Sequence, residues 1–424
     1  MKRVQTACGI VVAFLCIGAT GLAEGATFYA ALNGNDANSC AQAQSISTPK
    51  RTVSAGASCL QPGDTLFVRA GTYVESLIDK VPSGTSWSAP IRIAAYAGET
   101  VWLKPSSGYF VFGVGQNQQY VEFDRINMDG ANTTHGVIKI EAGFGGNPHH
   151  IRIKNAEIVG TPADSQAILA TAGATVVGGN EFINLTIHGG GRYDYNHGIY
   201  LQSSNNLVEG CTLYDLAGAA IQVYNGYGFQ ANNNVIRNNT IRNLRTGVQN
   251  IGPPLSPGRH WGIIVYSTNS GTQVYNNVIH SIPSNGGNTS GIEIVASNVL
   301  VANNTVYGVS GAGVRIGGGS SNSVRNNIAY GNSTNYSEIA GTIASNNLFG
   351  ADPLFVDANG GNFRPKSTSP AIDKGMTVSS VATDIAKVAR PQGGSYDIGA
   401  YEIDGAPVVE PLLPPVDVQV IVQN

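Results

Sequence analysis

Charged side chains are scarce in this chain: of its 424 residues, 12% are Asp, Glu, Lys or Arg, and the formal net charge is -3. A nucleic-acid-binding protein typically carries a basic patch, and a disordered chain combines high charge with low hydrophobicity. Here 42% of the residues are hydrophobic and there is no basic excess. The composition therefore argues against both classes and indicates a long, nearly neutral, folded protein without a nucleic-acid partner.

Lysine is missing from the whole stretch between Lys154 and Lys366, and carboxylates are sparse there. A calcium site needs several oxygen ligands around one ion. No acidic cluster that could supply them is visible, so no metal ligand is assigned. Calcium held by backbone carbonyls would leave no signature in the residue types, and Ca²⁺ therefore stays a candidate cofactor. The acidic residues between Asp164 and Glu338 are Glu181, Asp194, Glu209, Asp215 and Glu293.

Long hydrophobic runs are also missing, and no segment is long enough to span a membrane. A basic N-terminus precedes an apolar run from Ile10 to Ala19, and small residues follow in Gly21-Leu22-Ala23. This order is typical of a secretory signal peptide, which we expect to be cleaved after Ala23. We therefore expect the mature protein to be secreted, periplasmic or at the cell surface.

Cysteine is rare, with five residues, and the two nearest the N-terminus lie inside the expected signal peptide. Cys40 and Cys59 flank a predicted capping helix that begins at Thr48-Pro49 and carries Val53, Ala57 and Leu60 on one face. In an oxidising compartment we expect these two cysteines to form a disulfide. The remaining Cys211 occupies a core position of a repeat, which indicates a buried free thiol.

Glycine, in contrast, is abundant, with 54 residues, and two short patterns recur through the middle of the chain. One is an Asn-rich step that ends on an aliphatic, and the other is a Gly-aliphatic-x-aliphatic step. The core positions of the first step lie 23 to 38 residues apart, the length of one coil of short strands. Such periodicity predicts a β-solenoid in which the repeated Asn residues form a hydrogen-bonded ladder. These core positions are Met128, Ile158, Ile187, Leu213, Ile241, Ile279, Val306 and Ala329.

Several segments near both ends carry a resemblance to known families. Residues 62–73 and 89–93, which include Pro62-Gly63-Asp64-Thr65, resemble the opening coils of the pectate-lyase-like superfamily of secreted proteins. The stretches 352–355, 369–373 and 396–402 resemble the choice-of-anchor Q segment that closes some of these proteins. The resemblance implies an all-β fold: a right-handed parallel β-helix with an N-terminal capping helix and an irregular C-terminal cap.

The expected organisation follows from these landmarks. It comprises a signal peptide at 1–23, an N-terminal cap at 24–61, the parallel β-helix at 62–341, a choice-of-anchor Q-like cap at 342–404 and a flexible tail at 405–424.

Differences between coils point to a site. In each coil, a turn joins the core residue of the Asn-rich step to that of the Gly-aliphatic step. This turn is short from Leu213 to Ile221 and longer in the coils on either side. Loops 189–197 and 242–261 should therefore wall a cleft roughly 10 Å wide, or two strand spacings. Aromatics that stack on sugars, beside arginines that pair with carboxylates, favour an acidic polysaccharide, although aromatics packed across the coil edge would look the same. The candidate residues are Arg192, Tyr193, Asp194, Tyr195, His197, Tyr200, Gln202, Gln222, Tyr224, Arg259, His260 and Trp261.

The first functional hypothesis is a polysaccharide lyase. β-Elimination of a uronate needs a group that neutralises the carboxylate, a base for the C5 proton and an acid for the leaving oxygen. Many lyases of this fold use Ca²⁺ with Lys or Arg, which the missing lysines disfavour here. A His and Tyr route fits better, and a C5-epimerase would begin with the same proton abstraction. In this route His197 or His260 is the base, Tyr200 or Tyr224 the proton donor, and Arg259 or Arg192 the partner of the carboxylate.

Other functions are compatible with the same cleft. A non-catalytic exported adhesin or carbohydrate-binding scaffold would use it for binding alone and ranks nearly level with the lyase. A glycoside hydrolase would need two placed carboxylates, for which Asp194 and Asp215 are the candidate pair. Glu293 and Arg315, one coil apart, are interpreted as an exposed ion pair that contributes little.

Overall fold

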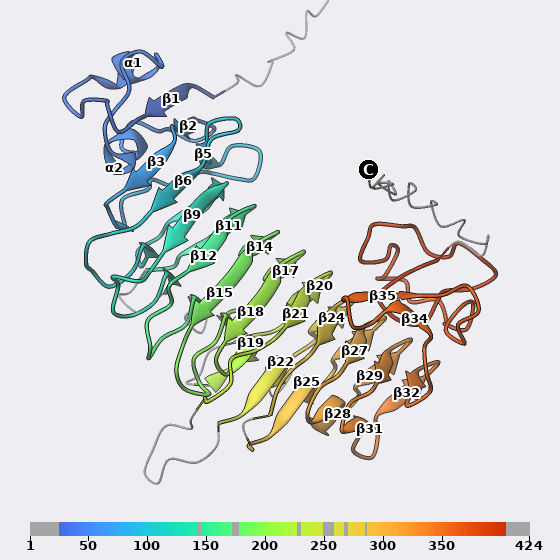
Figure 1. The fold of residues 1–424 in the computed structure, drawn as a ribbon. Coiled ribbons are helices and arrows are strands. Elements are labelled where there is room, and N and C mark those ends of the chain that lie inside the picture. Colours follow the sequence, from blue (N-terminus) through green and yellow to red (C-terminus); the bar gives the residue numbers. More distant parts are fainter. Residues whose placement is uncertain are drawn as a thin grey trace, which may run out of the picture.

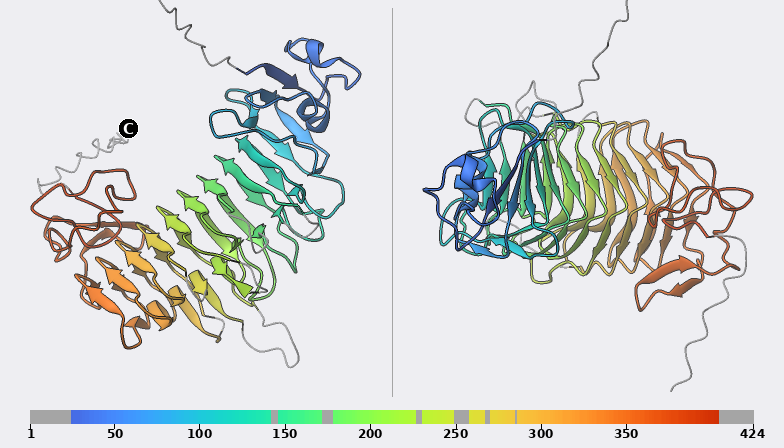
Figure 2. Two further views of the ribbon diagram at one scale, coloured as in Figure 1. Left: turned by 180° about the vertical axis from the view of Figure 1, so that it is seen from behind. Right: turned by 90° about the horizontal axis from the view of Figure 1, so that it is seen from above.

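The computed structural model describes residues 25–141, 146–171, 178–226, 230–248, 258–266, 270–284 and 286–403. The expected signal peptide and the expected tail lie outside the described residues. Three long parallel sheets, here called A, B and C, run the length of the molecule, and the chain visits them in turn (Figure 1). Each turn through the three sheets makes one coil, and Figure 2 shows the coils stacked side by side. This is the predicted parallel β-helix.

Sheet A opens each coil and has twelve strands in the described residues. They are β1 (Thr27–Ala30), β2 (Thr65–Val68), β5 (Ile91–Ala95), β8 (Gln119–Asp124), β11 (His149–Lys154), β14 (Glu181–Ile183), β17 (Leu207–Glu209), β20 (Val235–Arg237), β23 (Gln273–Tyr275), β26 (Leu300–Ala302), β29 (Ser323–Arg325) and β32 (Ile343–Ser345).

Sheet B follows sheet A in each coil and has eleven strands in the described chain. They are β3 (Gly71–Tyr73), β6 (Val101–Leu103), β9 (Ile126–Asp129), β12 (Glu157–Val159), β15 (Thr186–Gly190), β18 (Thr212–Leu216), β21 (Thr240–Arg242), β24 (Val278–His280), β27 (Thr305–Tyr307), β30 (Ile328–Tyr330) and β33 (Leu348–Phe349).

Sheet C completes each coil and has ten strands within the ranges given above. They are β4 (Leu77–Ile78), β7 (Phe112–Val114), β10 (Ile138–Ile140), β13 (Ile168–Thr171), β16 (Ile199–Gln202), β19 (Ala219–Tyr224), β22 (His260–Tyr266), β25 (Thr289–Val295), β28 (Ala312–Gly318) and β31 (Thr334–Ser337).

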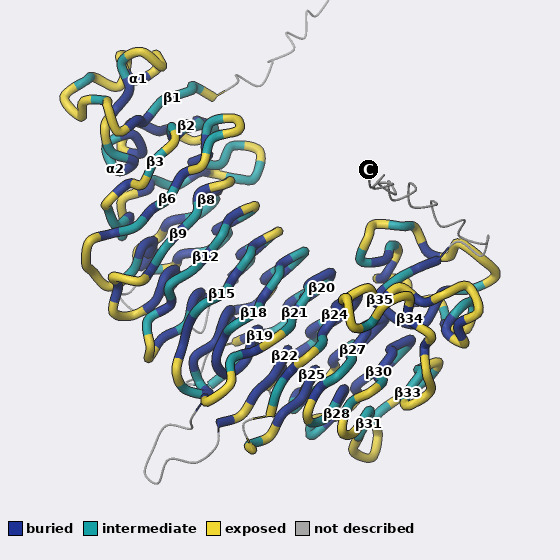
Figure 3. The backbone as a smooth tube through the Cα atoms, in the orientation of Figure 1, coloured by how far each residue is buried: buried dark blue, intermediate teal, exposed yellow. Residues whose placement is uncertain are grey.

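The predicted register is confirmed in both repeated steps. In sheet B the pairing runs from Met128 through Ile158 and onward to Ala329, in the predicted order. In sheet C, Ile168 pairs with Ile199 and the next strand continues with Ile221. These aliphatics are fully buried inside the coils, whose strands are largely buried in Figure 3. Burying one such side chain contributes about 1.5–3 kcal/mol, which explains why the aliphatic spacing dictates the register.

The Asn-Asn pairs divide two tasks between their members. The first Asn turns the backbone from sheet A to sheet B with a positive φ, as at Asn276 (φ 53°), a conformation that Asn tolerates well. The second faces inward and forms the predicted ladder, which is confirmed. Asn277 donates its side-chain N–H to Oδ1 of Asn304 at 3.0 Å and accepts at its own Oδ1 from Asn239 at 2.9 Å. All three residues of this ladder are fully buried, and their amides are satisfied.

The N-terminal cap contains two short helices, α1 (Cys40–Ala43) and α2 (Val53–Ala57). The predicted helix start at Thr48-Pro49 is wrong. The Lys50 N–H donates to the carbonyl of Tyr29 in β1, so Lys50 forms a bridge to that strand, and the helix begins later. Thr52 caps α2 by accepting from the Ala55 N–H. The predicted apolar face is present, because Val53, Ala57 and Leu60 are buried.

The predicted disulfide between Cys40 and Cys59 is confirmed, and Cys211 is a buried free cysteine. The disulfide closes a loop of 19 residues that carries both helices of the cap. We expect the double variant Cys40→Ser/Cys59→Ser to lose roughly 3 kcal/mol of stability, because the open loop raises the entropy of the unfolded chain. Urea unfolding of the purified protein with and without reductant tests this, and Cys211→Ser serves as the control that keeps the bond. An unchanged midpoint in the double variant would contradict the expectation.

The C-terminal segment 350–403 is irregular, with one antiparallel pair, β34 (Phe355–Asp357) and β35 (Asn362–Pro365). A cap should close the end of the stack, but this segment lies beside the last coils (Figures 1 and 2). The Phe363 ring lies 4.7 Å from His280 and 5.5 Å from Tyr307, between ring centroids. These side chains offer an aromatic surface on the outer face of sheet B, which explains the placement. None of the described helices is long and apolar enough to cross a bilayer.

Candidate functional site

A cleft of about 730 Å³ lies on the outer face of sheet C, over strands β13 to β25. It falls where the two loops of unequal length were expected to wall a site. Part of the second loop, 249–257, lies outside the described residues. The cleft is lined by Gln166, Leu169, Asp194, Tyr195, His197, Tyr200, Gln202, Gln222, Tyr224, Arg259, Trp261, Ile264, Tyr266, Asn288, Glu293 and Val295.

Three tyrosines form a row along the floor of the cleft, one from each of three successive coils. The ring centroids of Tyr200 and Tyr224 are 6.3 Å apart, and those of Tyr224 and Tyr266 are 5.5 Å apart. Tyr224 and Tyr266 stand above one another because they are paired outward residues of neighbouring parallel strands. Tyr200 pairs with Gln222 and is therefore offset by two residues along its strand, but its ring still reaches that of Tyr224. Such a row of aromatic faces, flanked by the amides of Gln202 and Gln222, can stack on successive rings of a sugar chain.

Arg259 and Asp194 join the two loops across the short coil that lies between them. The Asp194 Oδ2 accepts from Nε of Arg259 at 2.8 Å and from its main-chain N–H at 3.3 Å. The Asp194 side chain is 1% exposed, whereas that of Arg259 is 49% exposed and lies 5.1 Å from the Trp261 ring centroid. The buried carboxylate therefore fixes a guanidinium that faces the cleft, in a position suited to bind an acidic group.

His197 lies beneath this pair and beside the tyrosine row. Its Nδ1 accepts from the Ala219 N–H at 3.2 Å, so in the neutral ring the hydrogen is on Nε2. Burial, together with the nearby positive charge of Arg259, lowers the pKa of His197 to about 3. The ring makes an edge contact with Tyr200, with centroids 5.0 Å apart. This geometry favours His197 as a neutral hydrogen-bond donor over the base that the sequence suggested.

The buried His197 should make stability depend on pH. Between about pH 6.5 and the folded pKa of about 3, the unfolded chain protonates this ring and the folded chain does not. The free energy of unfolding should therefore fall as the pH decreases through this window, by about 1.4 kcal/mol per unit from this residue. We expect His197→Gln to show a shallower slope than the wild type in urea unfolding at a series of pH values. Identical slopes would contradict this assignment.

Three of the candidate residues do not line the cleft. His260 is fully buried, and its Nδ1 hydrogen is donated to the carbonyl of Pro283 at 2.8 Å. Arg192 lies over the Tyr193 ring, 5.2 Å from its centroid, and lines a neighbouring hollow together with Arg245. Tyr193 stacks on Tyr195 with centroids 5.6 Å apart.

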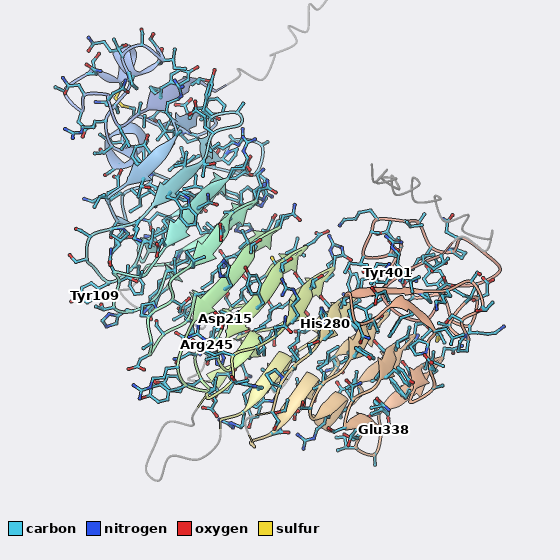
Figure 4. The ribbon with its side chains drawn as sticks, in the orientation of Figure 1. Tyr109, Asp215, Arg245, His280, Glu338 and Tyr401 are labelled. Carbon is cyan, nitrogen blue, oxygen red and sulfur yellow. A yellow bond between two sulfur atoms is a disulfide. The ribbon has the colours of Figure 1, made fainter. Side chains whose placement is uncertain are left out.

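The pair of carboxylates expected for a hydrolase does not meet in the cleft. Asp194 lines the cleft, but Asp215 belongs to β18 in sheet B and is bonded to Arg245 through both of its oxygens (Figure 4). Asp194 lies in the loop between β15 and β16, whereas Asp215 lies in a strand of sheet B, a difference that spacing along the sequence does not show.

Glu293 is a lining residue that the sequence reasoning missed. Its ion pair with Arg315 is present, but Glu293 is 2% exposed rather than solvated. Its carboxylate accepts from the Ser290 hydroxyl at 2.6 Å, and burial raises its pKa above the usual value. Its place on the outward row that also holds Tyr200 and Gln222 was a signal that could have found it.

Comparisons with known proteins agree with this architecture. Residues 140–252 match the family model described as a right handed beta helix region. A crystal structure of pectate lyase Pel9A superimposes with a TM-score of 0.61 at 17% identity, over 89% of this chain and 96% of that one. The fold is a right-handed parallel β-helix. The complex of XylC with xylose shares this β-helix, with a TM-score of 0.55 at 12% identity, over 89% and 98% of the two chains. No curated protein sequence matches.

Proposed function

We propose that this β-helix protein is exported and acts as a polysaccharide lyase that cleaves a uronate-containing chain by β-elimination. The observation that carries the proposal is the fixed guanidinium of Arg259 beside a row of tyrosines in one cleft. Stacking on the tyrosines would hold the sugars, and Arg259 would hold the carboxylate of one of them. The disulfide of the N-terminal cap and the polysaccharide-acting pectate lyase among proteins of this fold support the proposal.

The chemistry assigns a role to each group near Arg259. In β-elimination the C5–H and C4–O bonds break, a C4–C5 double bond forms, and the leaving oxygen takes up a proton. Negative charge moves onto the uronate carboxylate as the C5 proton leaves. The guanidinium of Arg259 and the Nε2–H of His197 are the cation and the hydrogen-bond donor that would stabilise this charge.

Tyr200 is the residue to which we assign the proton transfer. Its hydroxyl oxygen accepts from the Gln202 side-chain N–H at 3.0 Å, a bond that holds the group in place. As the phenolate, Tyr200 would take up the C5 proton and would then return this proton to the leaving oxygen. The ring contacts His197 and therefore stands at the same end of the cleft as Asp194 and its partner Arg259. Glu293 is three coils away from Tyr200, roughly 14 Å along the stack, too far to act on the same sugar.

Removing one hydroxyl tests this assignment. We expect Tyr200→Phe to lower kcat by about 10²–10⁴-fold, because general acid–base catalysis is lost while the ring still stacks. Tyr266→Phe is the matched control: it removes the same hydroxyl from the other end of the tyrosine row and should keep kcat within about twofold. Initial rates from the ultraviolet absorbance of the unsaturated product measure both. Equal rates for the Tyr200 variant and the wild type would exclude Tyr200 from proton transfer.

A non-catalytic binder is the second candidate, favoured by the fact that the tyrosine row by itself suffices to hold sugars. The purified protein should be incubated with pectate, alginate and glycosaminoglycans, with and without Ca²⁺. New ultraviolet absorbance supports elimination, and reducing ends without absorbance support hydrolysis and contradict the proposal. Binding without either signal supports the second candidate, and absence of binding to every polymer contradicts both.

A further inference from the structure

The face of sheet C that holds the cleft is electrically balanced. In the described strands β10 to β28 of this sheet, and in the lining of the cleft, each Lys or Arg contacts a carboxylate. This balance matters because the field of a cleft selects the charge of its ligand. The pairs are Lys139 with Glu141 (2.7 Å), Arg259 with Asp194 (2.8 Å) and Arg315 with Glu293.

The undescribed segments do not alter this balance of charge. Residues 142–145, 172–177, 227–229, 249–257, 267–269 and 285 contain no Lys, Arg, Asp or Glu. The arginine that faces the cleft is thus matched by its own buried carboxylate, and a further carboxyl, Glu293, lines the other end.

A ligand with a charge on every sugar would fit this cleft poorly. A chain lying along the tyrosine row passes several coils, so a homopolymer of uronate would bring several carboxylates against Arg259 alone. One of these carboxylates would approach Glu293, where the nearby Arg315 is already paired with that carboxyl and leaves no cation for the sugar. Neutral sugars meet no such penalty on the tyrosines and glutamines of the floor.

We propose that the cleft takes a polysaccharide in which single uronates are separated by neutral sugars. The uronate lies at Arg259, and neutral sugars lie on the tyrosine row and at Glu293. This inference deepens the proposed lyase function and rests on it for the role of the uronate as the reacting sugar. The charge preference itself shows in binding, whether or not cleavage follows.

The test compares polymers by calorimetric binding and, separately, by ultraviolet absorbance. Polygalacturonate represents the homopolymer, and gellan and a rhamnogalacturonan backbone represent separated uronates. We expect at least one of the two polymers with separated uronates to bind with a Kd about tenfold lower than that of polygalacturonate. This Kd should change less than about twofold between low and physiological ionic strength, because few ion pairs form.

A substitution at Glu293 tests the charge preference at the end of the cleft away from Arg259. Glu293→Gln leaves the charge of Arg315 without its carboxylate partner, so affinity for polygalacturonate should rise roughly tenfold, with affinity for the separated-uronate polymer within about threefold. Glu141→Gln is the matched control, because it breaks a similar ion pair on the same face outside the cleft and should change neither value. Circular dichroism checks that both variants are folded.

The two proposals fail in different ways. Tighter binding of polygalacturonate than of the other polymers, or a steep loss of affinity with salt, overturns the charge preference even if elimination is observed. Binding in the expected order without any elimination overturns the lyase function and supports the ligand class. Absence of binding to every polymer overturns both.

Discussion

Replacing Arg259 by alanine is expected to lower kcat/KM on a uronate polymer by about 10²–10³-fold, the range seen when one fixed stabiliser of transition-state charge is removed. The guanidinium lines the cleft and is held by a buried carboxylate at 2.8 Å, so it needs little reorganisation during the reaction. Charge on the uronate carboxylate grows as the C5 proton leaves, so the interaction is stronger in the transition state than in the ground state. The loss should therefore appear mainly in kcat.

Two further variants make this result specific. Arg245→Ala breaks a similar ion pair, at 3.0 Å with Asp215 of sheet B, and neither of these residues lines the cleft, so the variant should keep kcat/KM within about twofold. Arg259→Lys keeps the charge without the planar group and should give an intermediate rate. Wild-type activity in the alanine variant would show that Arg259 does not stabilise the reacting carboxylate.

The second large effect is expected in the interior, where Asn277→Ala should destabilise the fold by about 3–5 kcal/mol. The Asn277 side chain donates to Asn304 and to the carbonyl of Ile236, and it accepts from the main chain and side chain of Asn239. Truncation leaves these buried groups without partners in a place that is closed to bulk water. Each unpaired group then costs its desolvation.

Urea unfolding followed by circular dichroism measures this loss. Asn205→Gly is the matched control, because Asn205 is exposed and has a positive φ of 58°, which glycine adopts without strain. It should change stability by less than about 1 kcal/mol. If both variants unfold at the same urea concentration, the ladder does not stabilise the stack in the way inferred here.

Much of the fold could be predicted because its pattern is local. Aliphatics such as Ile187 and Ile199 recur once per coil, and only one register buries all of them. The position of the cleft was predictable for a related reason, since a coil with a short turn between two longer ones leaves a gap. The failures concern contacts outside this pattern. Lys50 pairs with Ala30 of β1 where a helix was expected, and the segment 350–403 packs on the aromatic side of sheet B.

The chemistry of the candidate site depended on such nonlocal contacts. Asp194 and Arg259 are 65 residues apart and contact each other only because the coil between them is short. His197 and His260 look alike in sequence, but one lines the cleft and the other is fully buried beside Pro283. The sequence alone led us to interpret Glu293 as a solvated charge. In the structure its carboxyl is buried, and burial raises its pKa.

By itself, the sequence determined the parallel β-helix, its register and the Asn ladder, because burial of aliphatics at fixed spacing leaves one arrangement open. The disulfide was predictable for a separate reason, since two cysteines flank the cap in a protein expected to be exported. Only the tertiary structure decided which polar side chains share the cleft, in which direction burial shifts their pKa values and how their charges are paired. Those properties depend on desolvation and on distances between residues of different coils. One and the same spacing of residues along the chain is compatible with many degrees of burial and many distances between side chains.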